Sequence, residues 1–320
     1  MDCPKCKAAI SSRAKFCEQC GIDLGKNLEF LHQKAIDHYH RGLVDEAIKI
    51  WDAAIAEAPD FAKGFYYKGL ALYDRGDLQA AIESFNKALE KEDKPFRVYF
   101  KLGMAQYGLG ELTDSIASFR RALEINPQSA ETHYRLGLSC LRHSDLENAR
   151  ISLELAIKLN PQYTRALFIL GMVFVQLGDN SQAAEKFKQV TEISPGYTGA
   201  RFELGMALFR QGALAQASEQ FQRAIADNDR FTPAYYMLGE TYRKLGEPSQ
   251  AISAYTEALK LSPKDADAYV HLAECYMQLD LLDAAREAVG NALAINPENR
   301  DAQYLKKHLG QLQTPHKPGF

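Results

Sequence analysis

The sequence predicts an all-α fold built as a solenoid of repeated helical hairpins, and three observations support that prediction. A 34-residue pattern recurs eight times from about Leu28 to Asn299, marked by a Leu-Gly pair at its seventh and eighth positions. Its twenty-seventh position is almost always alanine, and its twenty-fourth is large and mostly aromatic. Within each copy, apolar residues recur at helical spacing on both sides of a central turn. Repetition at this period indicates stacked supersecondary units rather than a single globular core.

Each copy is expected to contain two helices. The first helix ends at a turn whose glycine suits a C-terminal cap. This glycine occurs in six copies: Gly42, Gly76, Gly110, Gly178, Gly212 and Gly246. Ser144 and Asp280 replace it in the other two. The second helix usually ends before a proline, which cannot continue a helix.

Glycine at the eighth position lies inside the first helix, where it costs about 1 kcal/mol relative to alanine. We expect another helix backbone to pass there too closely for a Cβ atom, so that packing offsets the lost helix propensity. The first and last copies carry Ala35 and Ala273 instead, where a neighbouring repeat is missing on one side.

This combination of small, aromatic, alanine and proline positions resembles the tetratricopeptide repeat, over about 270 of the 320 residues. The resemblance implies a right-handed superhelical solenoid whose concave surface binds partner proteins. We expect four parts: a zinc ribbon at 1–26, eight repeats at 27–299, a capping helix at 300–313 and a flexible tail at 314–320.

Two Cys-x-x-Cys pairs stand near the start of the chain, separated by ten residues. Four thiolates in two tight turns match a closed tetrahedral zinc site. We therefore predict one structural Zn²⁺ held by Cys3, Cys6, Cys17 and Cys20. The segment is similar to the short zinc ribbons common at the termini of bacterial proteins. The alternatives are an iron site, which normally has a longer insert, and disulfides, which need an oxidising compartment.

So short a segment cannot bury enough apolar surface to fold alone, so the metal is expected to supply the folding free energy. Ile10, Phe16 and Ile22 or Leu24 are expected to form its small core. Nucleic-acid binding through the ribbon is an alternative, but the expected charge of the segment argues against it. Four cations flank Phe16, but a zinc tetrathiolate offsets their charge. They are Lys5, Lys7, Arg13 and Lys15.

Composition narrows the function classes. The net charge of −3 argues against a chain built for polyanions. No apolar run approaches 18 residues, so we expect no membrane span and a cytoplasmic protein. Cys140 and Cys275 are expected to be buried structural thiols. His32, His38 and His40 do not share one helical face, so we expect surface or edge residues rather than metal ligands.

Positions two, five, nine and twelve of each first helix share one face. In the family that the chain resembles, this face lines the partner-binding groove. The candidate groove residues are Tyr66, Tyr73, Phe100, Met104, Tyr107, Tyr134, Leu138, Phe168, Met172, Phe202, Met206, Phe209 and Tyr236. Basic residues are expected at its edge: Lys63, Arg97, Arg142, Arg165, Arg210 and Lys244.

Position nine is apolar in the first six copies and becomes Glu240 and Glu274 in the last two. The apolar floor and basic edge predict a groove for a peptide or helix with apolar anchors flanked by acidic residues. The alternative is that the same residues only pack the solenoid. The family members that clamp chaperone tails have Asn at position nine and Lys at position five, and this chain has neither.

No catalytic constellation stands apart from the repeats, so we predict that the protein is not an enzyme. The leading interpretation is an adaptor that binds a partner protein in its groove, with the zinc ribbon either structural or a second docking module. The alternatives are a self-assembling homo-oligomeric scaffold and nucleic-acid binding through the ribbon.

Overall fold

The computed structural model describes residues 2–11, 14–91 and 95–311. Within these residues it contains seventeen α-helices and no strand, apart from two isolated bridges in the N-terminal segment. The predicted all-α class is therefore confirmed. The handedness of a superhelix remains a prediction.

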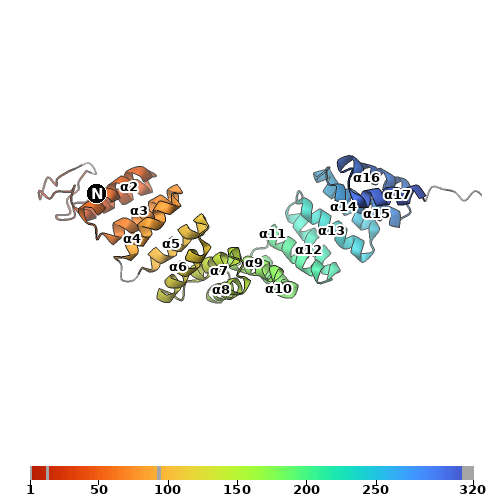
Figure 1. Ribbon diagram of the computed structural model, residues 1–320, viewed down its shortest axis with the longest axis horizontal. Helices are drawn as coiled ribbons and strands as arrows, with labels where there is room; N and C mark the ends of the chain where they lie inside the picture. The colour runs from red at the N-terminus through yellow and green to blue at the C-terminus, as the bar shows by residue number, and fades with distance from the viewer. Residues whose placement is uncertain (1, 12–13, 92–94, 312–320) are drawn as a thin grey trace, which may run out of the picture. The chain divides into compact units, whose positions relative to one another are not determined.

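The helices form eight consecutive hairpins followed by a seventeenth helix (Figure 1). Their bounds are α1 (Leu28–His40), α2 (Val44–Glu57), α3 (Ala62–Arg75), α4 (Leu78–Leu89), α5 (Phe96–Leu109), α6 (Leu112–Ile125), α7 (Ala130–Arg142), α8 (Leu146–Leu159), α9 (Thr164–Gln176), α10 (Asn180–Ile193), α11 (Thr198–Arg210), α12 (Leu214–Asp227), α13 (Thr232–Leu245), α14 (Pro248–Leu261), α15 (Ala266–Gln278), α16 (Leu282–Ile295) and α17 (Arg300–Gln311). The predicted capping helix corresponds to α17, and the predicted tail at 314–320 lies outside the described residues.

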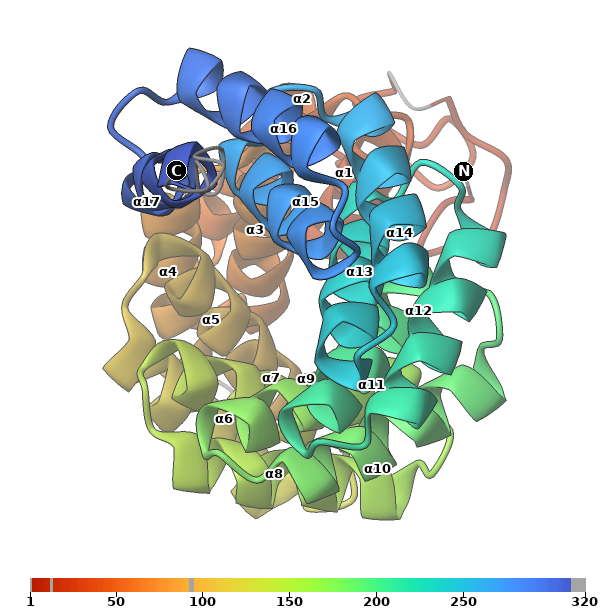
Figure 2. The ribbon, with the colours of Figure 1, turned by 90° about the vertical axis from the view of Figure 1, so that its right-hand side faces the viewer.

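The chain divides into two compact units. Unit 1 spans Met1–Pro161 and contains α1–α8, and unit 2 spans Gln162–Phe320 and contains α9–α17. Inside each unit, the second helix of one hairpin packs against the first helix of the next. Figure 2 shows this order at the end of unit 2, where α16 lies beside both α15 and α17.

The glycine at position eight faces the side chain at position twenty-four of the same hairpin, which is an aromatic ring in five repeats and Leu153 in the case of Gly137. A Cβ atom on Gly171 would lie 2.6 Å from the ring of Phe187, and one on Gly69 would lie 2.6 Å from the ring of Phe85. Both rings are fully buried. The expected close approach is therefore present, but the expectation of a neighbouring backbone was wrong. The twenty-fourth side chain fills the space instead.

The turn glycines all adopt positive φ, between 75° and 93°. Ser144 and Asp280 adopt the same left-handed conformation, with φ of 63° and 58°. This conformation is unfavourable for residues with a Cβ atom. The hairpin geometry therefore decides the backbone at these turns, whatever residue stands there.

His32 is half-buried and packs against neighbouring rings. Its ring lies between Phe61 and Tyr67, and the indole N–H of Trp51 donates a hydrogen bond to His32 Nδ1 at 3.2 Å. Burial lowers the pKa of His32. The imidazole is therefore a packing element of the first repeat.

Candidate functional site

The four N-terminal cysteines converge on one point. Their Sγ atoms all lie within 4.8 Å of one another, and the Cys3–Cys20 and Cys6–Cys17 pairs are each 3.6 Å apart. Sulfur atoms at about 2.3 Å from a tetrahedral metal ion would be separated by about 3.8 Å. The side chains therefore fit a single metal bound by four thiolates. The same separations are far too long for disulfide bonds.

Two similar turns bring the thiols together. In the first, the amide of Lys7 donates to the carbonyl of Cys3 at 2.9 Å, and in the second the amide of Gly21 donates to Cys17 at 2.8 Å. Lys7 and Gly21 both adopt positive φ. The backbone amide of Cys6 hydrogen-bonds to the Cys3 thiol and lowers the pKa of Cys3 to about 6, although burial opposes this. This favours the thiolate form of Cys3, which is the form that binds metals, whereas burial and the neighbouring thiols raise the pKa of Cys6 and Cys20.

The small core of this segment differs from the prediction. Leu24 is fully buried, whereas the side chain of Phe16 is 58% exposed. Phe16 forms an isolated bridge with Asp23, which fixes its backbone but leaves the ring outside. Placing Phe16 in the core was therefore wrong. Among the predicted flanking cations, Lys5, Lys7 and Lys15 are exposed, and Arg13 lies outside the described residues.

Within each unit, the predicted groove residues lie on one side of the first helices, and we call this side the inner face. Its aromatic residues at position five rest on the buried rings at position twenty-four. The ring centroids are 5.9 Å apart for Phe100 and Phe119, and 5.7 Å for Phe202 and Phe221. The position-five side chains are half-buried, so they support the fold and also present surface. Tyr134 differs, because it is buried and offers little surface to a partner.

Unit 1 contains a hollow on this face, which we call the inner-face hollow. It has a volume of about 200 Å³ and draws on α3, α5, α6 and α7. Its lining residues are Tyr73, Met104, Tyr107, Gly108, Phe119, Arg135 and Leu138. Four of these were predicted groove residues, namely Tyr73, Met104, Tyr107 and Leu138. Tyr66 and Phe100 are half-buried and do not line the hollow.

Cations lie over the rings around the inner-face hollow. Lys101 Nζ is 5.8 Å from the ring centroid of Tyr73, and the Arg142 guanidinium is 5.2 Å from that of Tyr107. Arg142 also donates a hydrogen bond to the Tyr107 carbonyl at 2.9 Å. Arg135 lines the hollow and pairs with Glu131 at 2.7 Å. The apolar floor is therefore edged by positive charge.

Sequence reasoning missed Lys101 and Arg135, which both occupy position six. That position lies four residues after position two and three before position nine, so helical geometry places it on the same face. The six predicted edge residues are all exposed: Lys63, Arg97, Arg142, Arg165, Arg210 and Lys244. None of the six lines the hollow itself, but Arg142 lies over the ring of Tyr107, which does.

In unit 2 the predicted groove residues form a second half-buried apolar strip. It comprises Phe168, Met172, Phe202, Met206, Phe209 and Tyr236. Lys244 Nζ lies 4.5 Å from the ring centroid of Phe209, which repeats the cation-over-ring arrangement of unit 1. Among the titratable groups here, Glu203 is half-buried, and burial raises its pKa.

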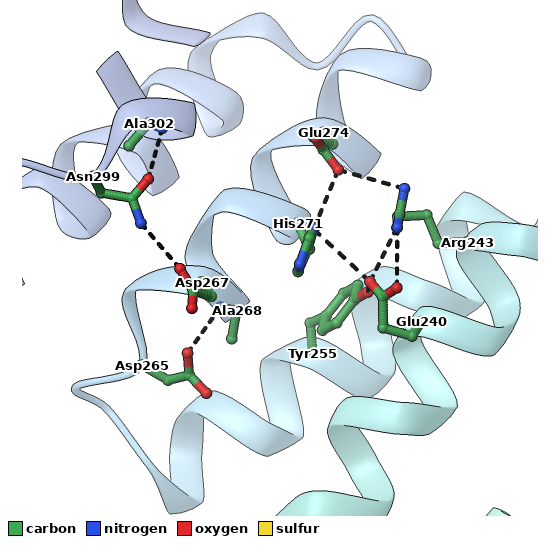
Figure 3. A network of polar contacts seen from close by, with 10 residues as sticks. All are labelled: Glu240, Arg243, Tyr255, Asp265, Asp267, Ala268, His271, Glu274, Asn299 and Ala302. Carbon is green, nitrogen blue, oxygen red and sulfur yellow. Dashed lines mark hydrogen bonds and ion pairs between the residues drawn. The ribbon is translucent and has the colours of Figure 1, made fainter. Parts of the chain in front are cut away.

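A polar network follows this strip in the last two repeats (Figure 3). Arg243 binds Glu240 through two hydrogen bonds of 3.0 and 3.1 Å and lies 3.6 Å from Glu274. The Tyr255 hydroxyl donates to Glu240, and His271 Nδ1 lies 3.3 Å from Glu274 and 3.8 Å from Glu240. Only 13% of the Glu240 side chain is exposed. The apolar strip therefore ends at a group of charged side chains that pair with one another.

The network makes stability depend on pH through His271. The hydrogen bond to Glu274 raises the pKa of His271, against the effect of burial. Protonated His271 therefore contributes its full share to the free energy of unfolding below the ordinary histidine pKa of about 6.5. This contribution is lost as pH rises through the raised pKa of His271 in the folded protein. We expect His271→Gln to lower the melting temperature more at pH 5.5 than at pH 9. Equal losses at the two pH values would contradict this assignment.

Cys140 and Cys275 are buried, as predicted, and burial raises the pKa of each thiol to about 11. Neither therefore has the character of a nucleophile or a metal ligand. Among the described residues, no helix is long and apolar enough to cross a membrane.

Comparison with solved structures places the repeats among known proteins. A structure of MamA is 26% identical, covers 53% of this chain and 92% of its own, and has a TM-score of 0.51. A tetratricopeptide repeat protein from Parabacteroides merdae (19% identity, 78% and 98% coverage, TM-score 0.54) shows the same fold. YrrB, described as a TPR protein with an unusual peptide-binding site, also shows this fold. It is 22% identical, covers 71% of this chain and 99% of its own, and has a TM-score of 0.51.

Comparison with curated proteins gives no match. Family models decide the classification. Two models described as tetratricopeptide repeat match residues 32–96 and 100–164 in one case, and 174–240 and 242–309 in the other. These matches extend across both units and include residues of all eight hairpins, although most of α9 lies between the matched ranges. The chain belongs to the tetratricopeptide repeat family.

Proposed function

We propose that the protein is a non-enzymatic adaptor whose inner face binds a peptide or helix of a partner protein. The observation that carries the proposal is the inner-face hollow of unit 1. A cavity of about 150 Å³ lined by aliphatic and aromatic side chains can bind benzene. The hollow, at about 200 Å³, therefore has room for one leucine or phenylalanine side chain.

The positive charges around the hollow indicate which residues should flank the apolar anchor of the partner segment. Lys101, Arg135 and Arg142 surround an apolar floor. Complementary potentials favour acidic residues next to the apolar anchor. Met104 supplies an unbranched, polarisable wall that can adapt to anchors of different shape. The partner is therefore a segment with one or more apolar anchors and acidic neighbours.

We further propose that the cysteine cluster holds one structural Zn²⁺ through Cys3, Cys6, Cys17 and Cys20. Their separations fit four thiolate ligands, and no open coordination position is needed for a stabilising role. The bound ion would supply folding free energy to a segment with little apolar core. A reducing, cytoplasmic setting is consistent with thiolates that are not disulfide-bonded.

Replacing Met104 and Met172 by glutamate tests the adaptor proposal. Two new carboxylates on the inner face should abolish partner capture, because they remove apolar surface and repel acidic flanks. The measurement is crosslinking capture from native lysate followed by mass spectrometry, with helicity and melting recorded in parallel. Unchanged capture by a folded variant would contradict the proposal.

The matched control replaces Glu83 and Glu185, which are exposed on the second helices α4 and α10, by lysine. This control should capture the same partners as the natural sequence. Sedimentation of purified protein at two concentrations separates an adaptor from a self-assembling scaffold. A monomer that shifts only when partner is added supports the adaptor, and concentration-dependent association supports the scaffold.

The exposed Phe16 supports a second docking role for the ribbon. An aromatic ring that is 58% exposed beside a metal centre is surface that a partner could cover. Phe16→Ala should remove a subset of the captured proteins while leaving the metal content at one ion per chain. If the natural sequence instead gives a steep, salt-dependent mobility shift with nucleic acid, the ribbon binds polyanions and this role is wrong.

A further inference from the structure

A second hollow lies at the far end of unit 2, and we call it the end hollow. It has a volume of about 410 Å³ and is open to solvent between α16 and α17. Its lining residues are Arg286, Val289, Gly290, Leu293, Lys306, Leu309 and Gly310. It belongs to the packing of a second helix against the next first helix, so it is distinct from the inner face.

The two preceding repeats carry larger side chains at the corresponding positions. Position twenty-five of one repeat lies against position eleven of the next, as when Gln222 donates a hydrogen bond to the Tyr242 hydroxyl at 2.6 Å. The next such pair, Thr256 and Tyr276, lines a common pocket. At the end of unit 2 the two positions are Gly290 and Gly310. The end hollow therefore lacks the tyrosine side chain that stands at position eleven in the two previous repeats.

No packing constraint requires these two glycines. A Cβ atom on Gly290 or on Gly310 would meet no heavy atom within 4 Å, and neither residue has positive φ. The other helical glycines in the described residues each have a close neighbour, such as Gly239 against the Tyr255 ring at 2.7 Å. Glycine inside a helix lowers helix stability relative to alanine. The pair thus opens the end hollow at a cost to the fold.

The chemistry of the end hollow is apolar inside and cationic at its mouth. Val289, Leu293 and Leu309 form the walls, and Lys306 also lines an adjoining pocket with Lys307. Arg286 pairs with Asp283 at 2.7 Å, but the Asp283 side chain is fully exposed, so the pair is weak. A cation beside an apolar cavity suits an aromatic ring with a neighbouring carboxylate.

We propose that the end hollow is a docking site for a partner protein, and that it takes one aromatic side chain flanked by acidic residues. Charge complementarity selects this occupant. The residues that follow α17, 312–320, include Lys317 and no acidic residue, so they complement the cationic mouth poorly. The end hollow lies away from the inner face, so this proposal does not depend on the adaptor proposal.

The test uses the full chain labelled with ¹³C at its leucine and valine methyl groups. The probe is the peptide Ac-Glu-Asp-Phe-Asp-Glu-NH₂, with Ac-Lys-Asn-Phe-Asn-Lys-NH₂ as the charge-reversed control. We expect saturable shifts of the Val289, Leu293 and Leu309 methyl signals with the acidic peptide only. Lys306→Glu should weaken this binding about tenfold. Gly310→Tyr, which restores the residue type of Tyr276, should abolish it and leave the protein folded.

Several results would overturn the proposal. These are the absence of shifts at the three methyl groups, equal binding of the basic peptide, or unchanged binding in Gly310→Tyr. Shifts caused by truncation after Gln311 would assign the hollow to the chain's own residues instead. Shifts that depend on protein concentration alone would assign it to a second copy. The Leu138 methyl signal reports separately on the inner-face hollow, so failure of the adaptor proposal is distinguishable.

Discussion

Replacing Phe187 by alanine should lower the stability of the α9–α10 hairpin by about 3–5 kcal/mol, the range measured for buried aromatic residues. Phe187 is fully buried, and its ring fills the space against Gly171. Repeat arrays unfold in parts, so hydrogen exchange of the α9 and α10 amides is the appropriate measurement. The loss should be largest in these two helices and should decay across the neighbouring hairpins.

A pair of glycine substitutions provides the matched control for this packing. Gly171→Ala places a Cβ atom 2.6 Å from the Phe187 ring, so it should destabilise the hairpin by about 1–3 kcal/mol despite the better helix propensity of alanine. Gly290→Ala meets no neighbour and should stabilise α16 by about 1 kcal/mol. A stabilising effect of Gly171→Ala would show that the ring does not explain the glycine.

Removing the metal should unfold the N-terminal segment and leave the repeats helical. Apparent binding free energies of about 10–16 kcal/mol are typical for structural zinc in small domains. We therefore expect Cys17→Ser, or a strong chelator, to abolish exchange protection of residues 2–26 while circular dichroism changes little. Elemental analysis of anaerobically purified protein should give one zinc per chain.

Cys140→Ser is the control for the metal experiment, because Cys140 is a buried thiol in α7, remote in sequence from the cluster. It should retain the full metal content. Finding iron in the purified protein, or no metal at all, would contradict the zinc assignment. Persistent structure in residues 2–26 after complete metal removal would contradict the proposed role of the ion in folding.

The repeated pattern predicted most of the fold because each hairpin contains the residues that specify its own turn and packing. The turn glycines, the glycine at position eight and the aromatic residue at position twenty-four recur in register, so eight copies agree on one geometry. Ser144 and Asp280 show the limit of local propensity, because tertiary structure imposes a left-handed turn on residues that disfavour it.

Side-chain environments outside the repeat consensus were harder to predict. Phe16 was expected inside because aromatic residues are usually buried, yet a segment with four metal ligands has little interior to offer. The environment of His32 depends on Trp51, 19 residues away, and that of His271 depends on Glu274 in the same helix and on Glu240 in the preceding repeat. The i,i+3 spacing of His271 and Glu274 was visible in the sequence, whereas the burial that lowers the pKa of His32 required the structure.

The cations at position six illustrate an intermediate case. Lys101 and Arg135 lie on the inner face by simple helical geometry, so the sequence contained the signal. Their position over the hollow became evident only when three successive first helices were placed side by side. The apolar floor was thus predictable from the pattern, whereas the shape of the hollow required the structure.

Site-specific photocrosslinking tests the adaptor account most directly. A benzophenone side chain is placed at Tyr107, which lines the inner-face hollow, or at Glu83, which is exposed on α4. The account predicts that a captured partner crosslinks from position 107 through a segment containing an apolar residue with acidic neighbours, and not from position 83. Crosslinks from position 83 with none from position 107 would show that partners bind another face.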